Sequence, residues 1–238
     1  MHRYSLLLFI IPACLLAGCA VSQKVSVTEY PPLDWAINAQ RLEQTGCTAS
    51  LQQACPELTA LGCDEIHGPR FHLGGLQPPY PVMECIHEGG EPPNRAYFRQ
   101  PAGLDTRYRS YAVFQDGKYR LVIKRSEFQA IFAPIESKEE ALSYAMAMTS
   151  LSARFDIDPA ASVDYLVDEI EETHAEETPD GYLVYLFDAD RAMGCDNHAF
   201  YSVNVLVTRD GEVREVKREE IYRSYACFDF GALTLDED

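Results

Sequence analysis

Residues 200–222 read FYSVNVLVTRDGEVREVKREEIY, and this stretch decides the fold. Its first half alternates apolar and polar residues, so that Tyr201 and the valines at every second position after it share one face of a strand. An Asp210–Gly211 pair then reverses the chain, and a second strand runs from Glu212 to Tyr222. The pattern predicts an antiparallel hairpin with one face on a core.

Two further hairpins are predicted upstream of this one. Residues 111–124 surround an Asp116–Gly117 turn, and residues 170–187 surround a turn at Thr178–Gly181. Asp-Gly pairs adopt the positive φ angles that tight hairpin turns need. Most of the chain after residue 110 is therefore expected to be antiparallel sheet.

A helix is predicted between these hairpins. Ser137 and Glu140 form a Ser-x-x-Glu capping box, which opens a helix of about 14 residues with one apolar stripe. The order of a helix followed by an antiparallel meander predicts an α+β fold, in which the helix packs on the sheet. This order is similar to cystatin-like and PepSY-type domains over roughly the last hundred residues. The likeness lies in element order, so it implies a layout and no activity.

The first nineteen residues have the features of an export signal. Arg3 gives a charged start, and Leu6–Leu16 is an apolar run shorter than the about 20 residues of a membrane span. The sequence Leu16-Ala17-Gly18-Cys19 then resembles the bacterial lipobox. The resemblance implies cleavage of residues 1–18 and attachment of lipid, including fatty acids such as palmitate, to Cys19. An ordinary signal peptide with an incidental cysteine is the alternative.

The lipobox resemblance also implies a location. Bacterial lipoproteins with aspartate after the lipidated cysteine tend to stay on the inner membrane, whereas this chain has Ala20. We therefore expect a lipid-anchored protein of the bacterial cell envelope, with the outer membrane favoured and the domain in the periplasm or at the surface.

Three segments are predicted after the leader. Residues 19–33 form a lipidated tether, residues 34–107 a cysteine-rich helical and loop segment, and residues 108–230 an α+β domain. The middle segment begins with a helix that ends at Gly46, and two further short helices are expected in residues 47–63, the second starting at Pro56. Its remainder is rich in glycine and proline and is expected to be mostly irregular.

The charge of the chain excludes some partners. There are 20 basic and 37 acidic residues, a formal charge of −17, and removal of Arg3 with the leader makes it −18. Such a surface repels nucleic acid and anionic head groups, so neither is an expected partner. The simplest interpretation is that acidity keeps the protein soluble.

Six cysteines besides Cys19 are predicted to form disulfides, because an even number in an oxidising compartment is expected to pair. These are Cys47, Cys55, Cys63, Cys85, Cys195 and Cys227. If Arg209 faces Glu212, Cys195 and Cys227 are one residue from direct opposition, and a single β-bulge would bring them together. The alternatives are pairing of each with a cysteine from residues 47–85, or free thiols.

A zinc site is the sharper alternative for the cysteine-rich segment. Cys63-x3-His67 and Cys85-x-His87, with His72 nearby, supply two cysteines and two or three histidines. Neither pair has the spacing that zinc sites usually show, so no metal ligands are predicted.

The search for catalytic residues finds one local cluster, Gly194-Cys-Asp-Asn-His198, and we interpret Cys195 as disulfide-bonded and His198 as a strand cap. His174 alternates with glutamates, which is typical of a solvated edge strand. The dense acids at 164–180 have no visible aromatic platform beside them, and Asp188-x-Asp190 is not a calcium loop. No catalytic residue and no cofactor is predicted.

The function predicted from the sequence is a membrane-anchored envelope lipoprotein that binds a protein partner or supports an assembly, without being an enzyme. An envelope hydrolase acting on peptidoglycan or peptide is the alternative, and binding of a small ligand or metal is a third. A cleft with convergent carboxylates, or a free Cys–His pair, would favour the hydrolase.

Overall fold

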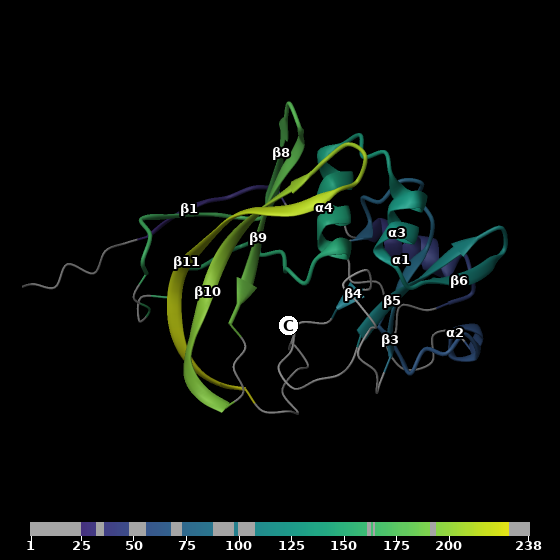
Figure 1. Ribbon diagram of the computed structural model, residues 1–238. Coiled ribbons are helices and arrows are strands. Elements are labelled where there is room, and N and C mark those ends of the chain that lie inside the picture. The colour runs from purple at the N-terminus through teal and green to yellow at the C-terminus, as the bar shows by residue number, and fades with distance from the viewer. Residues whose placement is uncertain are drawn as a thin grey trace, which may run out of the picture.

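The computed structural model describes residues 25–31, 36–47, 56–67, 73–87, 98–99, 108–160, 163, 165–190 and 194–228. Helices and antiparallel sheets are mixed along this part of the chain, which confirms the α+β class (Figure 1). No helix of the described residues is both long enough and apolar enough to cross a membrane.

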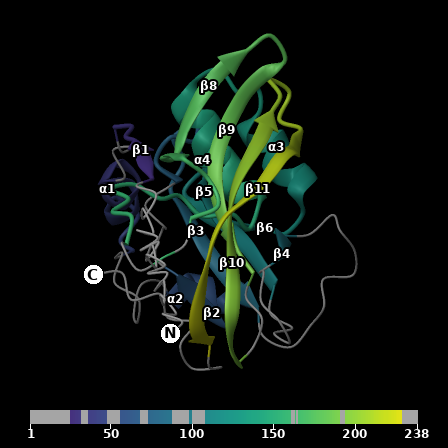
Figure 2. The ribbon, with the colours of Figure 1, turned by 90° about the vertical axis from the view of Figure 1, so that its left-hand side faces the viewer.

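The C-terminal half forms a four-stranded antiparallel sheet in the order β11-β10-β9-β8, whose long strands are seen side by side in Figure 2. Its strands are β8 (His174–Thr178), β9 (Gly181–Ala189), β10 (Gly194–Val207) and β11 (Val213–Phe228). Val203, Val205 and Val207 of β10 are fully buried in the main core. The face predicted from their alternation is therefore confirmed.

The β10–β11 hairpin differs from its predicted register. Val207 pairs with Val213 across a loop in which the Thr208 amide donates to the Glu212 carbonyl, so Arg209 does not face Glu212. The register then shifts twice, after Phe200 and after Asn204, where one bulge was predicted. The two shifts place Cys195 directly opposite Cys227.

Helix α4 (Lys138–Met148) packs against the inner face of this sheet, on β8, β9 and β10 (Figure 1). Ser137 is its N-cap, and the Ser137 hydroxyl accepts the Glu140 amide at 3.1 Å, as predicted. The prediction that α4 has a single apolar stripe is wrong, because every residue from Glu140 to Met148 is buried. The reason is that Tyr111, on a strand of the other sheet, also reaches the helix and donates to the Ala147 carbonyl.

That other sheet has five strands in the order β2-β3-β5-β4, with β6 also paired to β5. Its strands are β2 (Glu65–His67), β3 (Val82–His87), β4 (Phe98–Arg99), β5 (Tyr108–Gln115) and β6 (Lys118–Val122). The predicted hairpin is confirmed, since Asp116 and Gly117 connect β5 and β6 with φ angles of 55° and 77°. Strand β3 lies in a stretch predicted to be mostly irregular. It is buried on both faces, so its sequence does not alternate.

Helix α3 (Arg125–Phe132) was not predicted at all. Phe128 and Phe132 are buried in the main core and the partly buried Ile131 packs against it, a pattern of about one turn that is too short to identify a helix.

The N-terminal segment contributes three further elements. Helix α1 (Ala36–Glu43) is followed by Gly46 at a φ of 78°, and α2 (Pro56–Ala60) begins at Pro56, as predicted for both. Strand β1 (Ser26–Thr28), inside the predicted tether, pairs in parallel with β7 (Glu169–Glu171). The predicted strand at 170–177 is therefore two strands, β7 and β8, which lie in different sheets.

Candidate ligand-binding pocket

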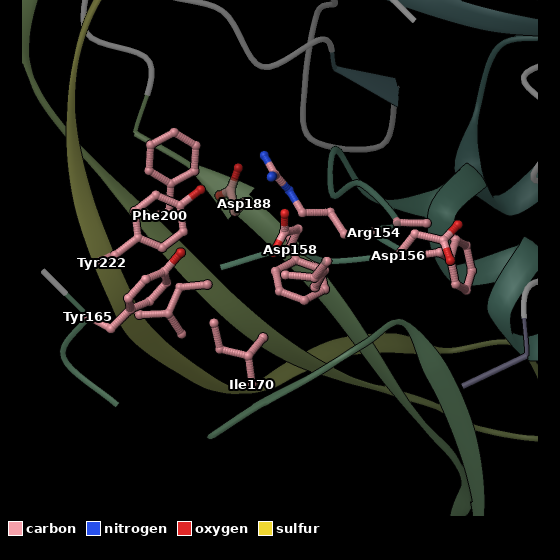
Figure 3. A pocket seen from close by; sticks show the side chains of 13 residues that line it. Arg154, Asp156, Asp158, Tyr165, Ile170, Asp188, Phe200 and Tyr222 are labelled. Carbon is pink, nitrogen blue, oxygen red and sulfur yellow. The ribbon is translucent and has the colours of Figure 1, made fainter. Parts of the chain in front are cut away.

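A hollow of about 640 Å³ lies on the face of the four-stranded sheet that points away from α4 (Figure 3). Side chains of β9, β10 and β11 form its floor, and the segment 153–158, which follows α4, forms a wall. Its lining residues are Ala153, Arg154, Phe155, Asp156, Ile157, Asp158, Tyr165, Ile170, Phe187, Asp188, Phe200, Ile221 and Tyr222. Because neighbours on a strand face opposite ways, Phe187 lines this hollow while Leu186 packs in the main core.

An aromatic wall forms one side of the pocket. The rings of Phe200 and Tyr222 are stacked, with centroids 4.4 Å apart and planes 12° apart, and Tyr165 meets Tyr222 edge-on at 5.4 Å. The Arg154 guanidinium carbon lies 5.6 Å from the Phe200 ring centroid. Burial raises the pKa of Tyr222, and the nearby charge of Arg154 partly offsets this. The wall therefore offers apolar ring faces, with the Tyr222 hydroxyl and the Arg154 guanidinium as its polar groups.

Three aspartates line the pocket, and they differ in their partners. Asp188 pairs with Arg218 at 2.8 Å, and Arg218 also binds Glu215 at 3.0 Å. These two carboxylates raise the pKa of Arg218. Asp156 and Asp158 are exposed on the 153–158 segment. Within the described part of the chain, neither of them is in an ion pair.

A buried glutamate holds the wall segment in place. Glu172, only 2% exposed, accepts the backbone amide of Ile157 at 2.8 Å and that of Tyr30 at 3.2 Å. Thr173 makes two hydrogen bonds to the backbone of Arg154. Its amide donates to the Arg154 carbonyl, and its hydroxyl accepts the Arg154 amide. Glu172 and Thr173, which lie between β7 and β8, thus hold both the pocket wall and the segment that follows β1 in place.

His174 is buried, so its predicted solvated position is wrong. Its ring is stacked between Tyr30 at 3.6 Å and Tyr185 at 4.0 Å. Burial and the carboxylates of Glu176 and Glu171 raise the pKa of Tyr185 to about 12. Strand β8 is an edge strand as predicted, but Tyr30 of the N-terminal segment covers the histidine.

A second hollow of about 320 Å³ adjoins the first, and the two share Ile170 and Ile221. Tyr185, Asn204 and Lys217 line it, and they form one row across three neighbouring strands. Ile170 and Ile221 therefore lie where the two hollows adjoin.

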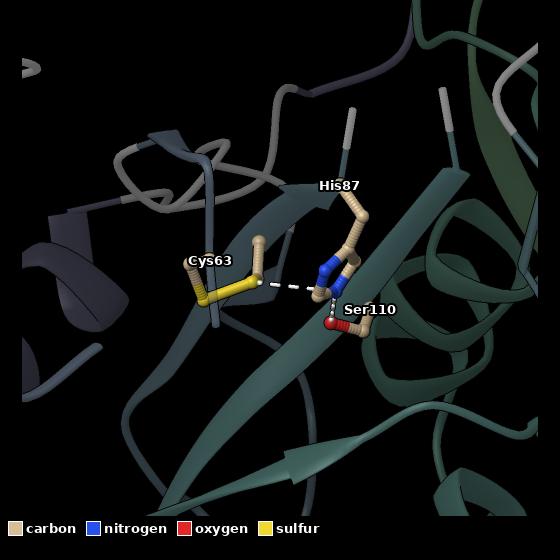
Figure 4. Close-up of a disulfide and its surroundings, with 4 residues drawn as sticks. Cys63, His87 and Ser110 are labelled. Atoms are coloured by element: carbon tan, nitrogen blue, oxygen red, sulfur yellow. Dashed lines mark hydrogen bonds between the residues drawn. A yellow bond between two sulfur atoms is a disulfide. The ribbon is translucent and has the colours of Figure 1, made fainter. Parts of the chain in front are cut away.

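The structure contradicts the zinc alternative in the cysteine-rich segment. Cys63 and Cys85 form a disulfide with Cα atoms 5.3 Å apart, so neither is a free thiolate (Figure 4). His87 Nε2 lies 2.7 Å from the Ser110 hydroxyl and 3.5 Å from the Cys85 sulfur. Among the described side chains, no group of three acidic, histidine or cysteine residues is arranged to bind a metal.

The remaining predicted cysteines are partly described. Cys47 and Cys195 are each in a disulfide. Cys19, Cys55 and the side chain of Cys227 lie outside the described residues. Although Cys195 and Cys227 face each other in the ladder, the bridge between them stays a prediction.

The Cys195–His198 cluster does not offer a nucleophile. A disulfide-bonded sulfur has no thiolate, and nucleophilic catalysis by cysteine needs one. His198 is 1% exposed within β10 rather than at the start of a strand, and its Nδ1 lies 2.9 Å from the Asp190 carbonyl.

His87 gives a pH-dependent contribution to stability. Burial lowers its pKa below the ordinary value. Below about pH 6.5 the unfolded chain protonates this imidazole while the folded chain resists, so stability falls as pH falls from about 6.5 towards the folded pKa. We expect His87→Gln to lose this component. Urea unfolding between pH 8 and pH 5 checks it, and parallel curves for the two proteins would contradict it.

Comparison of the chain with protein-family models, with curated proteins and with solved structures finds no match in any of the three.

Proposed function

We propose that this protein is a non-enzymatic binding module of the bacterial cell envelope, and that the pocket on the outer face of its four-stranded sheet takes a small ligand or a side chain of a partner. The single observation that carries the proposal is the pocket itself. Its volume of about 640 Å³ lies within the range of roughly 300–1,000 Å³ that is typical of ligand sites. Its lining combines an aromatic wall with charged groups, and these two kinds of side chain hold and orient ligands.

The proposal places the protein on a membrane, through lipid on Cys19, with the outer membrane favoured. The Leu16–Cys19 sequence supports this. Val25 is buried and β1 is paired with β7, and in the sequence only six residue steps separate Cys19 from Val25. Six residues span at most about 22 Å, so the pocket, which Ile170 of β7 lines, would stay close to the lipid surface.

The proposal includes the cysteine-rich N-terminal segment as a stabilised unit on the five-stranded sheet. Leu42 of α1, Leu58 of α2 and the Cys63–Cys85 disulfide share a small core with Met83 and Tyr119. Closing this loop of 22 residues is expected to contribute about 3 kcal/mol.

Ligand-observed NMR with three single-ring probes, benzyl alcohol, benzylamine and benzoate, tests the pocket in the mature protein. We expect saturation transfer to at least one probe, and its loss in Asp158→Trp, because a bulky ring at this exposed lining position fills the mouth of the pocket. The matched control is Asp180→Trp in the β8–β9 turn, which is expected to bind as the wild type does. No binding of any probe, or equal binding by Asp158→Trp, contradicts the proposal.

A further inference from the structure

We infer that the pocket selects an organic ammonium cation attached to a flat apolar body. This inference rests on the proposed function and names the chemical class of its ligand. It depends on three features of the lining: the balance of charge, the aromatic wall, and the position of the one lining arginine.

The charge of the lining is negative. It contains three aspartates and one arginine, and Arg218 beside it neutralises Asp188. Asp156 and Asp158 remain as exposed carboxylates on one short segment. The chain as a whole carries −17, so the surrounding field also attracts cations and repels anions.

The aromatic wall suits the same ligand. Ring faces carry negative potential, so a cation over a ring is attracted to it, and more strongly as water is excluded. The stacked Phe200–Tyr222 pair also offers an apolar surface for a flat group.

Arg154 shows that this wall accepts a cation. Its guanidinium carbon lies 5.6 Å from the Phe200 ring centroid, and its charge lowers the pKa of the neighbouring Tyr222, while the residue remains exposed. An exposed arginine side chain is free to swing out, so a ligand ammonium group can take this position beside the ring. The ligand body then lies along Phe200 and Tyr222, and the ammonium takes the place of the guanidinium in a lining whose exposed carboxylates are Asp156 and Asp158.

The test compares the affinities of the same three probes, which share one ring and differ in charge. At pH 7 and low salt we expect benzylamine to bind about tenfold more tightly than benzyl alcohol, and benzoate most weakly. The double variant Asp156→Asn/Asp158→Asn is expected to remove this preference, whereas Asp180→Asn leaves it unchanged. A capped phenylalanyl-lysine dipeptide, measured beside benzylamine, tells whether a peptide side chain or a free amine is preferred.

The outcomes separate the two proposals. Equal binding of benzyl alcohol and benzylamine, or an unchanged preference in the double variant, overturns the cation inference and leaves the pocket as a binding site. Binding of no probe to the wild type overturns both.

Discussion

Arg109→Met is expected to lower the free energy of unfolding by about 3–5 kcal/mol. The Arg109 side chain is 7% exposed, and its guanidinium lies 3.1 Å from the Glu84 carboxylate, which is 2% exposed. It also donates to the carbonyls of Ala147 and Thr149 at the C-terminal end of α4. Removing the guanidinium takes the Arg109 charge away from a buried carboxylate and takes a donor from the helix end.

Two further variants test whether the expected loss of stability comes from the burial of this ion pair or would follow the loss of any ion pair. Arg223→Met removes an exposed pair with Glu220 at 2.6 Å, and we expect almost no change in the free energy of unfolding, because solvent screens such a pair. The double variant Arg109→Met/Glu84→Leu should recover much of the loss, because it removes both buried charges of the pair together. Urea denaturation followed by circular dichroism measures all three. A cost below about 1 kcal/mol for Arg109→Met would contradict the expected role of the pair.

Arg109 connects the five-stranded sheet to helix α4. It belongs to β5 of the five-stranded sheet, and the carbonyls it binds end the helix that packs on the four-stranded sheet. Tyr111, also of β5, reaches Ala147 of the same helix at 2.8 Å. Residues from both sheets share one main core around α4. We therefore expect a single unfolding transition for the two sheets.

The features predicted from the sequence are those set by local physics. The Asp116–Gly117 turn follows from the φ angles these residues tolerate, and the Ser137 cap follows from the unpaired amides of a helix start. The buried face of β10 follows from alternation alone. Each of these signals is contained in a few neighbouring residues.

The features that were missed depend on distant parts of the chain. Strand β3 does not alternate because other elements cover both of its faces. His174 was predicted to be solvated because its neighbours on β8 are glutamates, whereas the ring that covers it comes from Tyr30. Strand β1 has only three residues, and its partner β7 lies more than 140 residues away. No local pattern contains that information.

The pocket was missed for the same reason. The aromatic platform that the sequence did not reveal is built from Tyr165, Phe200 and Tyr222, which lie in three separate segments. Phe200 and Tyr222 belong to the hairpin quoted first, but whether they meet depends on the register. The two register shifts of β10 and β11 place them opposite each other. The candidate site therefore needed the tertiary structure.

The largest effect on the protein's location is expected from Cys19→Ser, which should release it from membranes or leave it unprocessed. Each buried methylene of an acyl chain contributes about 0.8 kcal/mol, so loss of two or three chains weakens attachment by many orders of magnitude. Apart from Leu6–Leu16, the sequence offers no long apolar run as an alternative anchor. Fractionation with a carbonate wash, in cells that make either protein, measures the change.

Ala20→Asp is the matched control for this experiment, because it changes the neighbouring residue and keeps Cys19. The lipobox resemblance implies that this variant stays resistant to carbonate and moves from the outer to the inner membrane. The short link from Cys19 to Val25 adds a second readout. With β1 held on β7, cleavage between residues 20 and 24 should be slow on intact membranes and fast after detergent. Retention of Cys19→Ser on washed membranes would show that something other than lipid holds the protein there.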